Sequence, residues 1–446
     1  MEPADVIVAV ATAAGRSAVG VVRLSGVSLG SYLQPLLGCG PMPRRATLTD
    51  FLDRHGTPID TGIALYFPRP HSYTGEDVLE LQGHGGSAVI SLVLARCLEL
   101  GARLAQPGEF TRRAFLSGKL DLAQAESVAD LIDASSERAA RSAMRSLKGE
   151  FSQQIQRLVH VLVDLRAWAE AGIDFPEEEI DTLAEEVASA QLRDLTESIK
   201  RIKEAAMSGS LLREGAHVAL IGRPNVGKSS LLNKLAGEDV AIVTAVPGTT
   251  RDAIRQHLVM DGVPIHIVDT AGLRQTSDPV EQIGMARTWE VLDKADVALL
   301  LIDVTAGISG EDVETLKRLP SETTSIVVAN KIDLTDLPAA VSHHGNQVEV
   351  RISALSGAGI DLLRGEILKA IGWHPGEEGV FLARARHLDA LGKAELHLVQ
   401  ARLAISQLEL FAEELRLAQS SLNEITGEFS ADDLLGEIFG RFCIGK

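Results

Sequence analysis

Hydrophobic residues follow two kinds of pattern along this chain of 446 residues. Between about residues 216 and 373, short apolar runs such as Val297–Ile302 and Ser325–Ala329 alternate with stretches of helical period. This alternation is typical of a mostly parallel sheet with helices on both faces. Residues 257–268 differ, because an Asp-Gly pair separates two strand-like runs there. They predict a hairpin, and hence one antiparallel edge strand.

The segments on either side of residues 216–373 have the apolar spacing of helices. Apolar residues recur at intervals of three and four over Leu147–Trp168, which predicts one long amphipathic helix. A second helix is expected from about Asp181, after Pro176, which marks a helix end or start. Leucines recur at helical intervals again after Pro375. Each block presents an apolar face, so we expect both to pack as one bundle with the segment between them inserted; two separate helical hairpins are the alternative.

The first 118 residues are expected to form a compact α+β domain. Strands are predicted at Val6–Val10 and Val19–Leu24, and a half-buried strand at Asp77–Gln82, where polar and apolar residues alternate. A helix is predicted over about Ser87–Leu100. The predicted fold class is therefore an α/β domain inserted into an all-α helical domain, with an N-terminal α+β domain. The corresponding divisions of the chain are 1–118, 119–215, 216–373 and 374–446.

Composition narrows the compartment and the partners. No window approaches eighteen uninterrupted apolar residues, so no membrane span is predicted, and the acidic N-terminus is unlike a secretory signal. A cytoplasmic protein is expected. Its three cysteines, Cys39, Cys97 and Cys443, have no paired spacing, which excludes a disulfide framework and a zinc site. The net charge of −18 opposes a large nucleic-acid surface, so any RNA is expected to bind mainly through a basic partner.

The clearest chemistry lies at Gly222–Ser229, Gly-Arg-Pro-Asn-Val-Gly-Lys-Ser, between an apolar run and a helical pattern. A strand, this G-x-x-x-x-G-K-S loop and a helix aim backbone N–H groups and the positive helix end at one point, where phosphates bind. Lys228 is expected to reach the β- and γ-phosphates, and Ser229 to hold Mg²⁺. A glycine-rich turn that binds nothing is the alternative.

Three further motifs follow at successive predicted strand ends. Asp269–Gly272, Asp-Thr-Ala-Gly, is expected beside the magnesium ion and the γ-phosphate, as in switches that sense the third phosphate. In Asn330–Asp333, the carboxylate of Asp333 can accept from both donors of guanine, which adenine lacks, and such a site can discriminate by roughly 10⁴. Ser353–Leu355 would complete the base pocket. Together these motifs predict a GTPase.

With these motifs the chain resembles the translation-factor class of GTPases, and further stretches narrow the resemblance. Glu281 follows Asp269 by twelve residues. The other matching stretches are Val21–Gly26, Gly75–Gly86, Leu116–Glu126, Ile242–Asp252 and the tail Phe442–Lys446. Across its whole length the chain resembles the tRNA-modification GTPase MnmE (TrmE) family.

That resemblance implies an enzyme that acts with a flavin- and NADH-dependent partner, MnmG (GidA), in a heterotetramer or larger complex. Together they would add a carboxymethylaminomethyl group to carbon 5 of the wobble uridine of certain tRNAs. A tetrahydrofolate derivative, such as 5,10-methylenetetrahydrofolate, would supply the one-carbon unit. The resemblance also implies a homodimer, and an N-terminal domain that binds folate and dimerises.

The implied folate site uses Arg23, Glu80, Lys119 and Lys446. This mixture is chemically sensible, because a folate has a glutamate tail that attracts cations and a pterin edge whose donors need a carboxylate. Without the resemblance, Arg23 and Glu80 would be taken for ordinary surface residues. The C-terminal tail is expected either to reach this site or to be a frayed terminus. Cys443 is a candidate nucleophile, although the sequence places no base beside it.

Leu273 follows the Asp-Thr-Ala-Gly motif where Ras-like enzymes keep a water-orienting glutamine, and leucine cannot orient water. By resemblance, Glu281 and a K⁺ ion fulfil this role. The alternatives are a solvated acid at a helix end for Glu281 and a loop-bracing side chain for Asn225. The implied catalytic residues are Lys228, Thr250 and Glu281, with Mg²⁺ on Ser229 and Thr250, and K⁺ on Asn225, Thr244, Val246 and Thr249. The expected GTP-binding set is Asn225, Val226, Gly227, Lys228, Ser229, Ser230, Thr244, Ala245, Val246, Pro247, Gly248, Thr249, Thr250, Asp269, Thr270, Ala271, Gly272, Asn330, Lys331, Asp333, Ser353, Ala354 and Leu355.

Two other functions compete with this interpretation. A ribosome-assembly GTPase of the Era or Der type would use the flanking domains only to bind rRNA, but the acidic charge and the lack of a Gly-x-x-Gly loop beside basic residues oppose it. Alternatively, the N-terminal domain would be a separate folate-dependent transferase, with the GTPase as its regulator. The nucleoside at the tRNA wobble position distinguishes the three.

Overall fold

The computed structural model describes most of the chain. The described residues are 5–13, 15–174, 182–237, 255–269, 292, 294–321, 323–345, 347–373, 381–428, 438–440, 442 and 445. The chain divides into two compact units. The first comprises Met1–Ala129, Ser146–Leu195 and Lys393–Lys446, and the second comprises Asp130–Arg145 and Thr196–Gly392.

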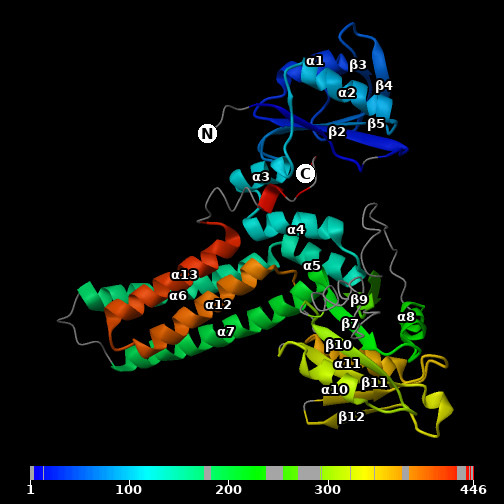
Figure 1. Ribbon diagram of the computed structural model, residues 1–446. Coiled ribbons are helices and arrows are strands. Elements are labelled where there is room, and N and C mark those ends of the chain that lie inside the picture. The colour runs from blue at the N-terminus through cyan, green and yellow to red at the C-terminus, as the bar shows by residue number, and fades with distance from the viewer. Residues whose placement is uncertain are drawn as a thin grey trace, which may run out of the picture. The chain divides into compact units, whose positions relative to one another are not determined.

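A six-stranded sheet forms the N-terminal part of the first unit (Figure 1). Its order is β3-β4-β5-β2-β1-β6, and neighbouring strands are antiparallel except β1 and β6. The three strands predicted from the sequence are present as β1, β2 and β5, and Leu24, Leu81 and Val93 pack in the core between this sheet and α2. The elements are β1 (Ile7–Val10), β2 (Val19–Gly26), α1 (Gly30–Leu37), β3 (Thr47–Leu52), β4 (Pro58–Phe67), β5 (Asp77–His84), α2 (Ser87–Glu99), β6 (Arg103–Leu104) and α3 (Glu109–Leu116).

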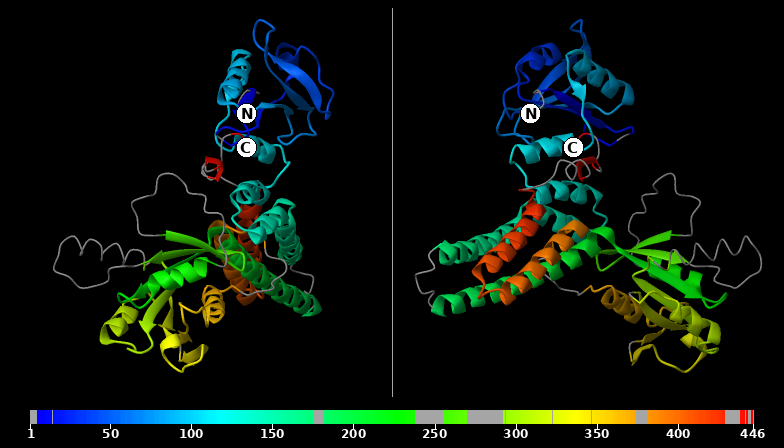
Figure 2. Two further views of the ribbon diagram at one scale, coloured as in Figure 1. Left: turned by 90° about the vertical axis from the view of Figure 1, so that its right-hand side faces the viewer. Right: turned by 60° about the vertical axis from the view of Figure 1, so that its left-hand side comes forward.

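The rest of the first unit is helical. Helices α6 and α13 come from opposite sides of the inserted segment, yet they pack along each other, and the portions of α7 and α12 in this unit run beside them (Figures 1 and 2). The helical elements are α4 (Leu122–Asp133), α5 (Glu137–Leu147), α6 (Glu150–Asp174), α7 (Thr182–Glu214), α12 (Ala385–Leu403) and α13 (Leu408–Thr426), of which α4, α5, α7 and α12 continue into the second unit.

Apolar residues at alternating intervals of three and four join α6 to α13. The buried residues of these two rows are Phe151, Ile155, Leu158, Leu162 and Leu165 on α6, and Phe411, Leu415, Ala418, Leu422 and Ile425 on α13. Trp168 also meets Phe411 edge-on, with ring centroids 6.0 Å apart. Such rows place apolar side chains on one face of each helix, where they can interlock. The predicted single bundle is therefore confirmed, and the alternative of two separate hairpins is wrong.

The long helix predicted from Leu147 is wrong at its N-terminal end. Leu147 ends α5, and α6 begins only at Glu150, because Gly149 between them has a left-handed backbone with φ 85°. The Gln124 side chain donates from Nε2 to the Leu147 carbonyl oxygen at 3.0 Å. That bond satisfies one of the carbonyl groups that a helix end leaves without an intrahelical donor.

A seven-stranded sheet lies at the centre of the second unit, in the order β12-β13-β11-β10-β7-β9-β8. The five strands from β13 to β9 are parallel. Alternate residues of β10 enter two separate cores, Leu299 beside Leu231 of α8, and Leu300 beside Leu316 of α10, so both faces are covered as predicted. The elements are β7 (Ala216–Gly222), α8 (Lys228–Ala236), β8 (Arg255–Met260), β9 (Val263–Asp269), β10 (Val297–Asp303), α10 (Gly310–Lys317), β11 (Thr324–Asn330), the 3₁₀ turn η1 (Ile332–Leu334), β12 (Ala340–His344), β13 (Gln347–Arg351) and α11 (Ile360–Ala370).

Both edges of this sheet are antiparallel, whereas the sequence predicted one such edge. The predicted hairpin is confirmed as β8 and β9. A second hairpin at the opposite edge pairs β12 with β13, from Ala340 opposite Arg351 to His344 opposite Gln347. Strand β12 is short, and none of its residues is buried. Its apolar pattern is therefore too weak to predict a strand.

The tip of the β8–β9 hairpin is held by residues of the same unit that lie outside the sheet. Arg138 of α5 pairs with Asp261 at 3.1 Å, and Trp373 Nε1 donates to the same carboxylate at 2.9 Å. Ser136 Oγ donates to the Gly262 carbonyl oxygen at 2.6 Å. A Cβ on Gly262, whose φ is 88°, would lie 2.6 Å from the Arg138 side chain. The Asp-Gly turn therefore permits a close contact between the sheet and α5.

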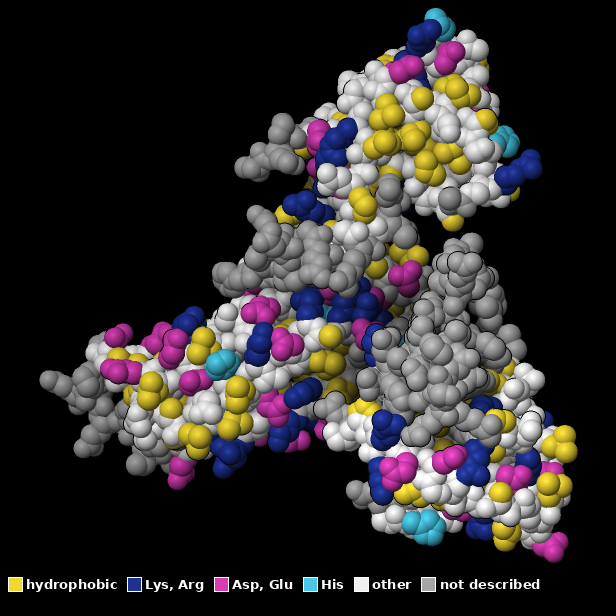
Figure 3. All heavy atoms as spheres, viewed as in Figure 1, with side chains coloured by type: hydrophobic (Ala, Val, Ile, Leu, Met, Phe, Trp, Pro, Cys, Tyr) yellow, Lys and Arg dark blue, Asp and Glu magenta, His cyan; other side chains and the backbone are white. Residues whose placement is uncertain are grey.

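Charges of both signs are interspersed on the face drawn in Figure 3, where Lys and Arg side chains alternate with Asp and Glu side chains. The whole chain has a net charge of −18. Among the described residues, no helix has both the length and the apolar character needed to cross a membrane.

Candidate functional site

The loop after β7 has the backbone that phosphate binding requires. Three residues from the end of β7 to the start of α8 have positive φ angles: Gly222 at 151°, Asn225 at 63° and Gly227 at 101°. The chain then enters α8 at Lys228, whose Nζ donates to the Gly222 carbonyl oxygen at 2.5 Å. The side chain of Lys228 thus bends back across the loop. The N–H groups and positive end of α8 are directed to the same place, which suits a phosphate.

Asn330 joins this loop to the next two strand ends. Its side chain is buried, with Nδ2 donating to the Val226 carbonyl oxygen at 2.8 Å and Oδ1 accepting from Ala354 N–H at 2.9 Å. A Cβ on Gly227 would lie only 2.3 Å from Asn330 Nδ2. Glycine at 227 is therefore needed both for its left-handed backbone and for this close approach.

The expected base pocket is assembled at the ends of β11 and β13. Ser353 is fully buried and donates from Oγ to Asp333 Oδ1 at 2.5 Å. The Ser353 oxygen also accepts from Ser356 N–H at 3.1 Å, so the Asp333 carboxylate is oriented by an ordered turn. Leu355 is 82% exposed. The two predicted segments of the pocket, Asn330–Asp333 and Ser353–Leu355, thus meet, with an exposed carboxylate and an exposed apolar side chain available to a base.

An additional residue, Asp303, pairs with Lys331, the second residue of the Asn-Lys-x-Asp motif. Lys331 has a left-handed backbone, φ 71°, and its Nζ pairs with Asp303 Oδ2 at 2.8 Å. The hydrogen bond from Lys331, with those from Thr305, lowers the pKa of Asp303 to about 2. The sequence analysis missed Asp303, although it ends the apolar strand β10 and is paired with Asn330 in the sheet register.

Several predicted nucleotide and metal residues lie outside the described residues. They are Thr244, Ala245, Val246, Pro247, Gly248, Thr249, Thr250, Thr270, Ala271, Gly272 and Glu281. Within the described part, Ser229 and Ser230 are exposed in the first turn of α8, and the pairing of Leu220 with Asp269 places the end of β9 beside the loop. A hydroxyl oxygen at this position fits the preference of Mg²⁺ for oxygen ligands.

Two of the N-terminal residues predicted to bind folate, Arg23 and Glu80, lie together. Arg23 of β2 and Glu80 of β5 face each other in the sheet register, with Arg23 Nε donating to Glu80 Oε1 at 2.9 Å. The guanidinium lies between two rings, 5.9 Å from the centroid of Tyr73 and 5.8 Å from that of Phe110. Sequence reasoning missed both rings, because neither is near Arg23 in the chain. The pair is only partly exposed, which strengthens its charge interaction.

The tail contacts this ion pair, and Lys119 lies beside the loop that carries Tyr73. The Cε atom of Lys119 lies 3.4 Å from the position of a Cβ on Gly75, in the loop that carries Tyr73. Gly445, from the tail, brings its carbonyl oxygen to 3.5 Å from Arg23 Nη1. The two remaining predicted residues of the tail, Cys443 and Lys446, are outside the described residues. A cation, a carboxylate, aromatic rings and the C-terminal backbone thus meet on one sheet face.

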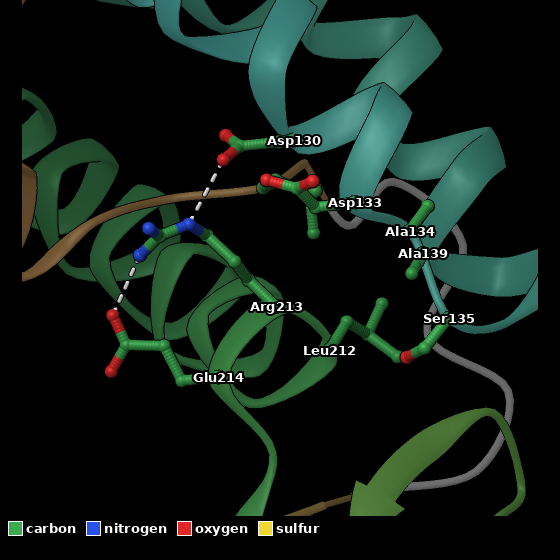
Figure 4. A pocket seen from close by; sticks show the side chains of 9 residues that line it. Asp130, Asp133, Ala134, Ser135, Ala139, Leu212, Arg213 and Glu214 are labelled. Atoms are coloured by element: carbon green, nitrogen blue, oxygen red, sulfur yellow. Dashed lines mark hydrogen bonds and ion pairs between the residues drawn. The ribbon is translucent and has the colours of Figure 1, made fainter. Parts of the chain in front are cut away.

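A cavity of about 210 Å³ lies at the other end of β7 from the phosphate loop (Figure 4). Asp130 at its edge accepts from Arg213 Nε at 2.9 Å and from Arg384 Nη2 at 2.8 Å. Asp133 and Glu214 also line it, so both charge signs are present. None of the residues predicted from the motifs lines this cavity.

These features define a P-loop GTPase: a strand, a glycine loop and a helix in a sheet of parallel strands, followed by an Asn-Lys-x-Asp motif at a strand end. A family model of the MnmE helical domain matches residues 122–443, and one of the GTP-binding protein TrmE N-terminus matches residues 6–119. The chain belongs to the tRNA modification GTPase MnmE family and is a GTPase that acts in tRNA modification.

Full-length relatives agree with this assignment. The tRNA modification GTPase MnmE of Thiobacillus denitrificans is 59% identical over 99% of this chain and 98% of its own length. That of Chromobacterium violaceum is 57% identical, with the same coverage. A crystal structure of a variant of Aquifex aeolicus Era bound to GDP.AlF4⁻ is 30% identical, covers 42% of this chain and 67% of that one, and has a TM-score of 0.29.

Proposed function

We propose that the chain is a K⁺-dependent GTPase that modifies the wobble uridine of certain tRNAs with a flavin-dependent partner, MnmG. The product would be a carboxymethylaminomethyl group on carbon 5 of the base. A tetrahydrofolate derivative, such as 5,10-methylenetetrahydrofolate, would supply the one-carbon unit in the N-terminal domain. We keep the domain divisions at residues 118, 215 and 373 as part of this proposal.

The contact between Arg23, Glu80 and Gly445 supports the proposal most strongly. Arg23 donates hydrogen bonds to Glu80 on the neighbouring strand and to the carbonyl oxygen of Gly445, which is 422 positions away in the chain. The site they form is partly exposed. An arginine and a carboxylate that face solvent together can bind a ligand that carries both anionic groups and N–H donors. A folate has both. Arg23 would orient the acidic part or the tail, and Glu80 would accept from the pterin edge.

The nucleotide half rests on the described loop geometry. Lys228 would bind the β- and γ-phosphates, and Ser229 with Thr250 would hold Mg²⁺, which neutralises the phosphate charge. Asn225 is exposed and has the left-handed backbone of a sharply bent loop, so its side-chain oxygen is available as a K⁺ ligand. With Thr244, Val246 and Thr249, Asn225 would hold a cation where other GTPases use an arginine finger. Glu281 would orient the attacking water.

We expect GTP hydrolysis to be at least about tenfold faster in KCl than in NaCl at equal ionic strength. An arginine finger is worth about 10³–10⁵ in rate, and a cation at the same position would supply part of that charge stabilisation. Phosphate release in the two salts measures the ratio. Asn225→Ala should remove the difference while GDP still binds. Light scattering with GDP, aluminium fluoride and each cation would test whether G domains pair across a homodimer. Equal turnover in both salts would exclude the cation site and leave Asn225 as a loop brace.

Mass spectrometry of wobble nucleosides tests the whole proposal. A strain that lacks this gene should lose the carboxymethylaminomethyl group from its tRNA, and the plasmid-borne wild-type chain should restore it. A strain with unchanged wobble nucleosides but altered rRNA processing would support the ribosome-assembly alternative instead. If modification persists with a GTPase-dead chain, the N-terminal domain is a separate transferase that the GTPase regulates.

The remaining elements of the proposal concern partners and location. The mixed charges on the surface in Figure 3 and the net charge of −18 favour tRNA contact mainly through MnmG. We also infer a homodimer formed through the N-terminal domain, a heterotetramer or larger complex with MnmG, and a cytoplasmic location. Cys443 stays a candidate nucleophile of the tail. The family matches over residues 6–119 and 122–443 disfavour the Era or Der type.

A further inference from the structure

Two aromatic residues near the C-terminus are buried against the N-terminal part of the helical region. Phe439 and Phe442 are 2% and 7% exposed, and they share a core cluster with Leu122 and Ala125, against which Phe115 packs. The ring centroids of Phe439 and Phe442 are 5.5 Å apart, and that of Phe439 is 6.4 Å from Phe115. Chain termini are usually poorly ordered unless packing holds them. We call Phe439 and Phe442 the aromatic anchor.

The backbone at the anchor makes an equally close contact. Gly108, at the start of α3, has φ 66°, and a Cβ there would lie 2.6 Å from the Phe439 carbonyl oxygen and 3.0 Å from Phe442 Cβ. A residue with a side chain would therefore displace the terminal segment. The anchor is held by α3 as well as by α4.

Three residues after Phe442, the chain reaches the Arg23–Glu80 pair. Gly445 is buried, with φ 103°, and a Cβ there would lie 2.4 Å from the Val10 carbonyl oxygen at the end of β1. Its own carbonyl oxygen is 3.5 Å from Arg23 Nη1. Three residues span at most about 10 Å when extended. The position of Phe442 therefore decides whether the end of the tail can touch this ion pair.

We infer that the aromatic anchor positions the C-terminal tail at the Arg23–Glu80 pair for the tRNA modification reaction. The inference rests on the proposed function, and it gives Phe439 and Phe442 a role that lies outside the site itself. Neither ring touches Arg23 or Glu80 in the contacts described above, so both act through the tail backbone. Without the anchor, ordering the tail would cost backbone conformational entropy at each turnover.

The test compares Phe442→Ala with Phe411→Ala in the full-length protein, together with MnmG and tRNA. Phe411 is fully buried in α13 of the same unit. Phe411→Ala is therefore a matched control, because it also removes a buried aromatic ring but does so away from the tail. We expect Phe442→Ala to lower kcat for modification by roughly 10- to 100-fold, as a small misplacement of a reacting group can. Its KM for tRNA and its GTP hydrolysis should stay at the wild-type values. Phe442→Leu, which keeps apolar volume, should restore most of kcat.

The outcomes separate positioning from general stability. Equal losses of kcat in Phe442→Ala and Phe411→Ala, each in proportion to the fall in Tm, would overturn the inference, as would a normal kcat in Phe442→Ala. If Phe442→Ala does not fold, Gly445→Ala decides, because it leaves the anchor intact and blocks the approach to Val10. Wild-type kcat in Gly445→Ala then overturns the inference. A wild-type protein that leaves the wobble uridine unmodified would instead contradict the proposed function.

Discussion

Asp333→Asn is expected to change a GTP-binding protein into one that prefers xanthosine triphosphate. The Asp333 carboxylate can accept from the ring N–H and the exocyclic amine of guanine, whereas an amide supplies a donor for the carbonyl of xanthine. We expect GDP affinity to fall by roughly 10⁴, the discrimination available when a polar group loses its partner. Titration with fluorescent GDP and xanthosine diphosphate measures both affinities.

The structure indicates that this substitution leaves the pocket folded. Ser353 Oγ donates to Asp333 Oδ1, and an asparagine oxygen can still accept that hydrogen bond. Asp336→Asn makes the same chemical change three residues away, on an exposed side chain, and should bind GDP like the wild type. Unchanged GDP affinity in Asp333→Asn would mean that the guanine pocket lies elsewhere.

Arg23→Ala is expected to abolish tRNA modification and to leave GTP hydrolysis intact. The substitution removes the partner of Glu80 and the donor to the tail carbonyl at once. We expect at least about a 100-fold loss of modification rate, because the ligand and the tail would both lose their orientation. Nucleoside mass spectrometry and phosphate release on the same preparation measure the two activities.

Arg96→Ala provides a matched control in the same domain. Arg96 pairs with Glu99 within α2 at 3.2 Å, so the Arg96→Ala substitution also removes one arginine–glutamate ion pair. It should keep both activities. Direct titration with 5-formyltetrahydrofolate adds a readout that needs neither MnmG nor tRNA, and binding should weaken only in Arg23→Ala. Wild-type folate binding in Arg23→Ala would contradict the folate site while leaving the GTPase assignment untouched.

Local features of the sequence predicted the nucleotide-binding elements well. The phosphate loop, its strand and its helix are contiguous in the chain. The glycines at 222 and 227 indicate positive φ angles, which glycine adopts more readily than other residues. The Asp-Gly hairpin was likewise predictable, because a turn of this kind depends on the two central residues. Periodicity over many residues also predicted the bundle helices, since one apolar stripe must be buried against another.

Distant contacts and weak local patterns escaped prediction. The end of α5 at Leu147 depends on Gly149 and on the Gln124 side chain, which interrupt an otherwise unbroken apolar rhythm. Strand β12 has little apolar character of its own and forms because β13 offers it an edge. For β12 the tertiary partner outweighs the local preference, whereas Gly149 is a local helix stop that the apolar spacing around it conceals.

The chemistry divides in the same way. The motif allowed Asn330, Lys331 and Asp333 to be predicted from the sequence, because the residue types expected to recognise guanine follow one another in the chain. Only the folded sheet joins Asn330 to Val226 and Ala354, and Lys331 to Asp303, since strand register brings those positions to one edge. The meeting of Arg23 with Gly445 has the longest separation of all. No local pattern encodes such a contact, because the two residues are 422 positions apart and only the fold of the whole N-terminal sheet brings them together.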